Sequence, residues 1–236
     1  MNAAILLLTD SRLPAGGHAH SGGVEQAVTS GAVHDVPSLG SFLRGRLHTA
    51  GAVAAALAAA SCAFASGTTA FASGTTGAPP AWAWAGLDAE VDARTASPAQ
   101  RAASRVQGRL LLRVARRLWP SPVLEELAGA VPSPHHPLAL GAAAHAAGAA
   151  PEDAALAAAY HAISGPATAA VRLLGLDPVA VHRLLADLSR ELPTAPGERD
   201  CPPSAAPWAD LPAHSAPALD LLAERHALAQ VRLFVS

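Results

Sequence analysis

The sequence predicts an all-α protein, a single-domain helical bundle of about seven helices joined by Pro- and Gly-rich loops. Hydrophobic residues make up 51% of the 236 residues but aromatic residues only 4%, because alanine dominates. Alanine is the best helix former, whereas the β-branched and aromatic residues typical of strands are scarce. Apolar residues also recur at three- and four-residue spacing along several segments. A chain of this length can bury one sizeable core, so we expect one domain over residues 1–236.

The stretch 7–33 is the most unusual part of the sequence, because two glycine pairs flank His18 and His20. A short apolar run ends at Pro14 and Gly16-Gly17, which stop a helix. A second glycine pair, Gly22-Gly23, precedes a predicted helix over 24–28 that stops near Gly31. Two glycine pairs leave a backbone that another group can approach closely.

The next predicted helix starts at Pro37-Ser38 and ends near Ala65. After it the sequence repeats itself, FASGTTA at 64–70 and FASGTTG at 71–77. Short duplications rich in Ser, Gly and Thr are tolerated in surface loops. We therefore expect a loop over 64–81, followed by a connection through Trp82 and Trp84.

The clearest amphipathic helix is predicted from Ser97-Pro98, a capping-box start, to about Trp119. One of its faces is apolar. The opposite face carries Arg101, Arg105, Arg109, Arg113, Arg116 and Arg117. Such a stripe is usually the solvated side of a helix, and it could also contact an acidic partner.

The rest of the chain reads as helices separated by proline-rich segments. We expect a break or kink at Gly165-Pro166 and a long loop over 193–217. The predicted helical segments are 138–147, 151–164, 167–174, 178–192 and 218–230.

Composition excludes several classes of function. The formal charge is −2, which gives no pull toward nucleic acid or an anionic membrane. All 16 basic residues are arginine, so a Walker A lysine and a Schiff-base lysine are impossible. Cys62 and Cys201 suggest neither a disulfide nor a metal motif. The apolar stretches are too short for a signal peptide or a membrane span, so we expect a cytoplasmic protein.

No catalytic arrangement is visible, and the chain is predicted not to be an enzyme. Ser21 follows no strand and so is not a nucleophile elbow. The best metal candidates are His18 and His20, whose imidazoles could both reach an ion such as Ni²⁺. A backbone-capping or interface role for the pair is the alternative. His135 and His136, among prolines, are more typical of a polar loop.

The last six residues, 231–236 (VRLFVS), place apolar side chains on a chain end that would fray unless it docks. Two interpretations stay open. The segment can dock on the chain's own core, or it can serve as an interaction peptide for a partner.

Several segments together resemble the urease accessory protein UreF family. The N-terminal match is 13–17 (LPAGG), 21–25 (SGGVE) and 31–33 (GAV). The later matches are 104–111 (SRVQGRLL), 136–141 (HPLALG), 169–173 (AAVRL) and 232–236 (RLFVS). Departures include His18 and His20, where many members have aromatic residues, and the segment after 173, which lacks the usual PLGQ.

The resemblance implies a non-catalytic all-α dimer that scaffolds urease maturation. Its implied partners are UreD (UreH in some organisms), the GTPase UreG and apo-urease. Nickel would be handled by the complex, GTP and Mg²⁺ would belong to UreG, and no cofactor would be held tightly by this chain. The candidate partner-binding residues are Pro14, Gly16, Gly17, Ser21, Gly23, Glu25, Gln107, Gly108, Arg172, Arg232, Leu233, Phe234 and Ser236.

An alternative hypothesis is a stand-alone nickel-binding protein that depends on His18 and His20. A nucleic-acid role for the arginine stripe would require a steep salt dependence of binding, which the overall charge argues against.

Overall fold

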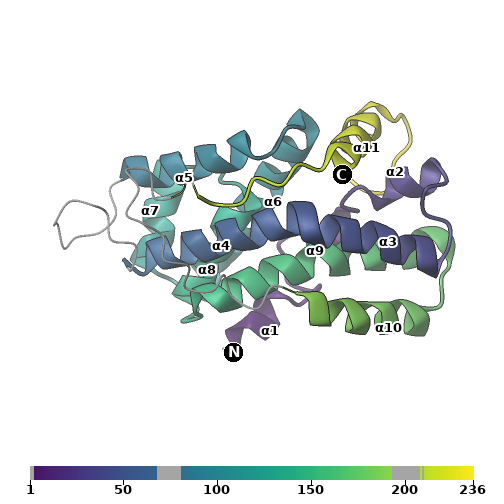
Figure 1. Cartoon of the computed structure of the whole chain (residues 1–236). Coiled ribbons are helices and arrows are strands. Elements are labelled where there is room, and N and C mark those ends of the chain that lie inside the picture. The colour runs from purple at the N-terminus through teal and green to yellow at the C-terminus, as the bar shows by residue number, and fades with distance from the viewer. Residues whose placement is uncertain (1–2, 68–80, 193–207, 209) are drawn as a thin grey trace.

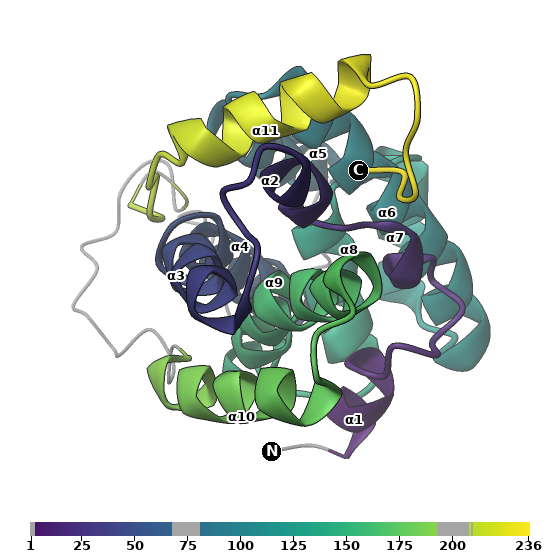
Figure 2. The same ribbon diagram turned by 90° about the vertical axis from the view of Figure 1, so that its right-hand side faces the viewer.

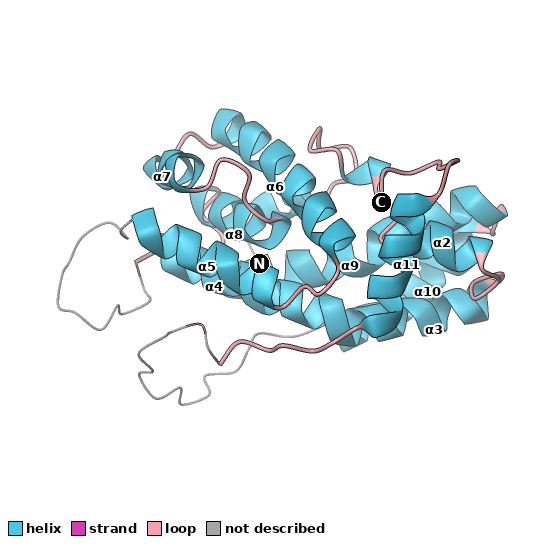
Figure 3. Ribbon diagram, turned by 90° about the horizontal axis from the view of Figure 1, so that it is seen from above, coloured by secondary structure: helices cyan, strands magenta, loops and turns pink. Residues whose placement is uncertain are grey.

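The computed structural model describes residues 3–67, 81–192, 208 and 210–236, and within these ranges it contains helices and no strand (Figures 1 and 3). The all-α prediction is confirmed. The helices are α1 (Ala4–Leu8), α2 (Val24–Thr29), α3 (Val36–Arg46), α4 (Ala52–Ala65), α5 (Ala81–Ala93), α6 (Pro98–Leu118), α7 (Pro122–Ala130), α8 (His136–Ala146), α9 (Pro151–Leu174), α10 (Pro178–Leu188) and α11 (Pro217–Leu228).

The centre of the bundle is formed by α4, α8 and α9, which pack against one another along their alanine-rich faces. Figure 2 looks along this bundle, with α10 on one side of α9 and α11 crossing above α2. Alanine allows the helix backbones to approach closely. At Gly141 on α8 no side chain fits at all, because a Cβ would overlap the Ala58 carbonyl oxygen of α4. The Ser61 hydroxyl donates a hydrogen bond to the Leu138 carbonyl across the same contact, at 2.8 Å.

The helix predicted from Pro37 to Ala65 is present as α3 and α4, joined without a break by a π-helical turn at Leu47–Gly51. The stretch Val36–Ala65 is long and apolar enough to cross a membrane by length and composition alone. However, 56% of its most apolar window is buried inside the structure. It serves here as the central helix of the bundle.

Two features differ from the sequence prediction. The expected connection before Leu87 is helical, as α5, and Trp84 on it packs edge-on against Phe64 with ring centroids 4.6 Å apart. Helix α2 (Val24–Thr29) was predicted, whereas the short helices α1 and α7 add to the predicted count. The duplication at 64–77 lies mostly outside the described residues, as does most of the predicted 193–217 loop.

The predicted break at Gly165-Pro166 is wrong, because α9 continues through Pro166 as one helix of 24 residues. Proline has no N–H, so the carbonyl four residues earlier loses its helical partner. That carbonyl belongs to Ala162, and the Arg46 Nε of α3 donates to it at 2.8 Å. The same guanidinium donates through Nη1 to the Gly22 carbonyl at 2.9 Å. Arg46 therefore replaces the missing helical bond and ties α9 to the N-terminal turn.

The contact between α4 and α8 gives a direct test of this packing. We expect Gly141→Ala to lower the free energy of unfolding by about 1–3 kcal/mol, because the added methyl must displace backbone. The matched control is Gly129→Ala on α7, where a Cβ meets nothing within 4 Å. That change should be neutral or slightly stabilising. Denaturant unfolding of the three proteins measures both effects, and an equal stability of Gly141→Ala and wild type would contradict the packing.

Candidate functional site

The two sequence motifs at opposite ends of the chain meet in space. The Val235 N–H donates to the Ala19 carbonyl at 2.7 Å, and the Ser21 N–H donates to the Ser236 carbonyl. These bonds pair the last residues with the glycine-rich turn in an extended, ladder-like arrangement. We call residues 16–25 together with 232–236 the terminal junction. It lies beside α11 and α2 (Figure 2).

Glu25, in the first turn of α2, anchors the junction. Its side chain is buried, and its two carboxylate oxygens accept the backbone N–H groups of Leu233 at 2.7 Å and Phe234 at 3.1 Å. A carboxylate with two N–H donors is a strong, charge-assisted acceptor. Buried His226 of α11 lies beside it, with Nδ1 3.7 Å from the Glu25 carboxylate and Nε2 3.3 Å from the Phe234 carbonyl. Glu25 therefore holds the C-terminal backbone from the inside.

Phe234 is the side chain that docks. It is 6% exposed, and the guanidinium of Arg172, at the end of α9, lies 5.0 Å from its ring centroid. An arginine over an aromatic face is attracted by the ring's negative face. Three motif residues, Glu25, Arg172 and Phe234, thus converge at one place.

The neighbours of Phe234 point outward. Val231, Leu233 and Val235 are 88%, 73% and 58% exposed, respectively. The segment 231–236 therefore docks on its own chain through the Phe234 side chain and through the backbone of Leu233 and Phe234. The exposed side chains form an apolar ridge, and contiguous exposed apolar groups commonly mark interaction sites.

The glycine-rich turn needs its glycines for conformation and contact. Gly16 has φ +78°, and a Cβ on it would lie 2.8 Å from Leu110 of α6. Gly22 has φ +60°, and a Cβ on it would lie 2.8 Å from Pro166 of α9. The turn therefore fits closely against two helices, while Pro14 and Gly17 stay exposed.

The structure separates the two predicted residues on α6. Gln107 lines a cavity of about 580 Å³ that also reaches Arg232, Val235 and Ser236. Gly108 is buried instead against the loop before α8, where a Cβ would overlap the Pro134 carbonyl. An intrachain contact thus accounts for the glycine at 108, and a partner-binding role for it stays a prediction.

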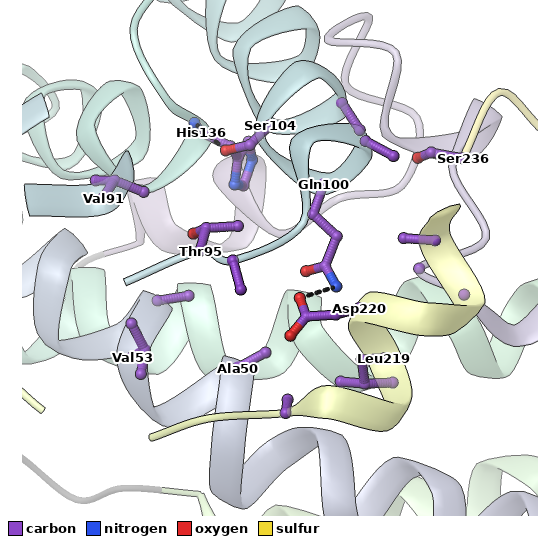
Figure 4. Close-up of a pocket in the computed structure, with 18 of the residues that line it drawn as sticks. Ala50, Val53, Val91, Thr95, Gln100, Ser104, His136, Leu219, Asp220 and Ser236 are labelled. Carbon is purple, nitrogen blue, oxygen red and sulfur yellow. Dashed lines mark hydrogen bonds between the residues drawn. The ribbon is translucent and has the colours of Figure 1, made fainter. Parts of the chain in front are cut away.

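The cavity beneath the terminal junction is walled by α4, α6 and α11 (Figure 4). Alanine is the commonest residue in its lining, and polar and charged side chains are interspersed among the alanines. The Gln100 side-chain amide donates to Asp220 at 3.1 Å, and Ser104, one turn further along α6, lies beside His136 (Figure 4). In this described part of the chain, Gln100 and Asp220 are already paired with each other rather than aimed at a substrate.

A partly buried ion-pair network was not predicted from the sequence. Arg105 of α6 reaches Asp88 at 2.8 Å and Asp92 at 2.6 Å, both on α5. His135 completes the network, with its backbone N–H donating to Asp88 at 2.9 Å and its ring Nε2 2.9 Å from Asp92. Arg105 is thus not part of a solvated stripe as expected. A spacing of four between Asp88 and Asp92 was the available signal.

The same network includes Asp88, Asp92 and His135, whose ligand atoms lie within 4.8 Å of one another, as a metal site would require. The guanidinium of Arg105 already supplies the cation, because it hydrogen bonds to both carboxylates. Neighbouring His135 and Arg105 hold the pKa of Asp92 below its usual value. The geometry is that of a cross-link between α5, α6 and the loop before α8.

The predicted metal pair, His18 and His20, lies on one short turn but in unlike surroundings. His18 is exposed, whereas His20 is buried with its Nδ1 2.6 Å from the Ser236 hydroxyl oxygen. Burial, and to a smaller extent the charge of His18, lowers the pKa of His20 to about 4. His20 is therefore neutral at pH 7, and metal binding by the pair stays a prediction.

Removing the Glu25 carboxylate should release the C-terminal segment. We expect Glu25→Ala to speed amide hydrogen exchange at Leu233 and Phe234 by at least about tenfold, since a hydrogen bond to a charged group contributes about 1.5–3 kcal/mol. Gln26→Ala, one position along α2, is the matched control. Unchanged exchange at both amides in Glu25→Ala, with the α4 amides also unchanged, would contradict the anchoring role.

The buried histidines should make the fold acid-sensitive. Burial lowers the pKa of His136 to about 3 and that of His161 to about 4, from 6.5. Between pH 6.5 and 4 the unfolded chain binds protons there that the folded chain does not, so stability falls as pH falls. We expect the Tm to drop by several degrees from pH 7 to pH 5, at about 2–4 °C per kcal/mol. The drop should shrink in His161→Asn and persist in His182→Asn, which changes an exposed residue; equal drops in both would contradict this origin.

Comparison with known proteins identifies the family. The UreF family model matches residues 33–189. The urease accessory protein UreF of Mycolicibacterium vanbaalenii is 46% identical to this chain. The match covers 99% of this chain and 98% of the relative. UreF of Mycobacterium sp. strain JLS is 46% identical over 98% of this chain and 97% of its own. UreF of Mycobacterium tuberculosis strain H37Rv is 41% identical over 99% of this chain and 98% of its own length. The chain belongs to the urease accessory protein UreF family.

Proposed function

We propose that this protein is a non-catalytic scaffold that bridges UreD and the GTPase UreG while nickel is inserted into apo-urease. Family membership supports the role in urease maturation. The observation that carries the scaffold role is the terminal junction. The Glu25 carboxylate is occupied by the N–H groups of Leu233 and Phe234, while the side chains of Val231, Leu233 and Val235 stay exposed. A preorganised apolar ridge is suited to bind another protein at a low entropic cost.

The proposed chemistry of the complex is divided among its members. GTP and Mg²⁺ would be bound by UreG, because this chain has no lysine for a Walker A motif. Nickel would pass within the complex, and this chain would hold no cofactor tightly. Within the described residues, the buried carboxylate of the junction, Glu25, is committed to two backbone N–H groups and is not poised for acid–base work.

UreD is the proposed partner of the terminal junction, and the chain would act in the cytoplasm as a homodimer. A ridge of exposed aliphatic side chains gains binding energy when it is buried. Arg172 and Arg232, both exposed at the edge of the junction, add positive charge that can steer the encounter. The pattern of an apolar centre with a charged rim is typical of specific protein interfaces.

An aspartate on the ridge should weaken UreD binding without undocking the segment. We expect Leu233→Asp to weaken UreD binding at least about tenfold, because a charge would be desolvated in the interface. Phe234 and the Glu25 bonds are unaffected, since they involve the backbone of 233 and a different side chain. Biolayer interferometry with purified UreD measures the affinity.

The matched control is Val179→Asp on α10, another exposed aliphatic residue at 75% exposure. It should bind UreD like wild type. Deletion of residues 232–236 should abolish both UreD binding and urease activation in a urease-positive cell. Wild-type UreD affinity in Leu233→Asp and in the deletion would overturn the assignment of this surface.

A further inference from the structure

The cavity beneath the terminal junction has a guanidinium without a counter-ion on its wall. Half-buried Arg46 lines this cavity of about 580 Å³. Its Nε and Nη1 donate to the Ala162 and Gly22 carbonyls, whereas its Nη2 has no acceptor within the described residues. No carboxylate of those residues forms an ion pair with it. A charge removed from water is costly unless it is paired, so this position favours an anion.

Two other arginines that extend into the protein are paired with carboxylates. Arg94 lines the same cavity, its side chain is only 7% exposed, and it forms an ion pair with Glu90. Arg105 forms ion pairs with two aspartates of α5. Arg46 differs from both, because its hydrogen bonds go to neutral carbonyls that leave its charge unbalanced.

Two neutral polar side chains on the cavity wall also lack hydrogen-bond partners in the part of the chain that the structure describes. They are the Gln107 amide on α6 and the His136 imidazole on α8. They come from adjoining segments, because a Cβ on Gly108 would lie 2.7 Å from the carbonyl carbon of His135. Burial lowers the pKa of His136 to about 3, so its ring is neutral at pH 7. The amide and the neutral imidazole can each donate an N–H to an oxygen.

Helix α9 links the position of Arg46 to that of His136. Arg46 contacts the Ala162 carbonyl, and the ring centroid of the preceding residue, His161, lies 5.8 Å from that of His136. Ala50, which follows Arg46 along the same continuous helix, lies on the wall of the same cavity (Figure 4). The cation and the two neutral donors therefore line neighbouring parts of one cavity.

We infer that this end of the cavity binds a small oxyanion, with Arg46 as the cation and with Gln107 and His136 as neutral hydrogen-bond donors. A guanidinium presents its N–H groups in a planar fork that matches the oxygens of a carboxylate or a phosphate. Cavities of about 300–1,000 Å³ are the usual size of small-molecule sites. The inference concerns this chain alone and does not rest on the proposed scaffold role.

One acidic side chain, that of Asp220, lines the same cavity. It accepts hydrogen bonds from the Ser97 N–H at 3.3 Å and from the Gln100 amide at 3.1 Å. Gln100 precedes Gln107 by about two turns, which is about 10 Å along α6. Asp220 is thus engaged at the other end of the cavity and leaves the Arg46 end positive.

The test is isothermal titration calorimetry of the full chain with sodium phosphate and, separately, sodium acetate, at pH 7.5 and an ionic strength held constant with sodium chloride. We expect one anion per chain in wild type. Arg46→Gln should lose at least about tenfold in affinity, because the charge is removed. Ala50→Leu should lose a similar factor, because the larger side chain fills the cavity while both Arg46 hydrogen bonds stay. The two anions distinguish a phosphate ligand from a carboxylate ligand.

The matched controls are Arg183→Gln and Ala186→Leu on α10, which change exposed residues and should bind like wild type. Circular dichroism identifies any variant that fails to fold, and if Arg46→Gln does so, Ala50→Leu and Gln107→Leu decide the question. Failure of wild type to bind either anion would overturn the inference. Wild-type affinity in folded Arg46→Gln or in Ala50→Leu, or an equal loss in Arg183→Gln, would overturn it as well. UreD affinity is measured separately, so the scaffold role is judged independently.

Discussion

The guanidinium of Arg46 is the interaction on which the rest of the structure depends. It donates to the Ala162 carbonyl, which Pro166 leaves without a helical partner, and to the Gly22 carbonyl of the glycine-rich turn. Burial lowers the pKa of Arg46 to about 10, so it remains charged at neutral pH. A charged donor between two buried carbonyls forms strong hydrogen bonds. Arg46 therefore fixes the turn, α3 and α9 relative to one another. Glu25 lies three residues after Gly22 and is placed by the same contacts.

The alanine-rich composition explains why polar cross-links matter so much here. Alanine faces let α4, α8 and α9 pack closely, but each residue buries little apolar surface. At the edges of the bundle, buried and partly buried ionic groups hold the elements in place. Arg105 with Asp88 and Asp92 fastens α5 to α6, and Glu25 with the backbone of Leu233 and Phe234 fastens the C-terminal segment. Small side chains also leave the cavity under the junction open.

Much of the helical fold could be predicted from local pattern. The amphipathic spacing of α6 and its Ser97-Pro98 start are local signals, and the structure places that helix at Pro98–Leu118. The continuity of α9 could not be predicted, because the bond that replaces the missing proline N–H comes from a residue 116 positions away. The helix α5 was missed because its burial rests on Trp84 against Phe64, a contact between distant segments.

The candidate site was predictable as a set of residues but not as an arrangement. Motifs indicated Glu25, Arg172 and Phe234, yet only the fold shows that they meet. Alternation along an extended segment could not say whether Leu233 or Phe234 faces inward; in the structure Phe234 is buried beside Arg172 and Leu233 is exposed. Gly108 had the same motif signal, and the structure places it against the Pro134 carbonyl of the loop before α8.

We propose that UreD binds the terminal junction. Hydrogen–deuterium exchange of the full chain with and without UreD tests it most directly. The account predicts that new protection on binding is concentrated in residues 14–25 and 231–236, with α10 unchanged. Protection confined to α10 or to α7, with the junction unaffected, would contradict the account.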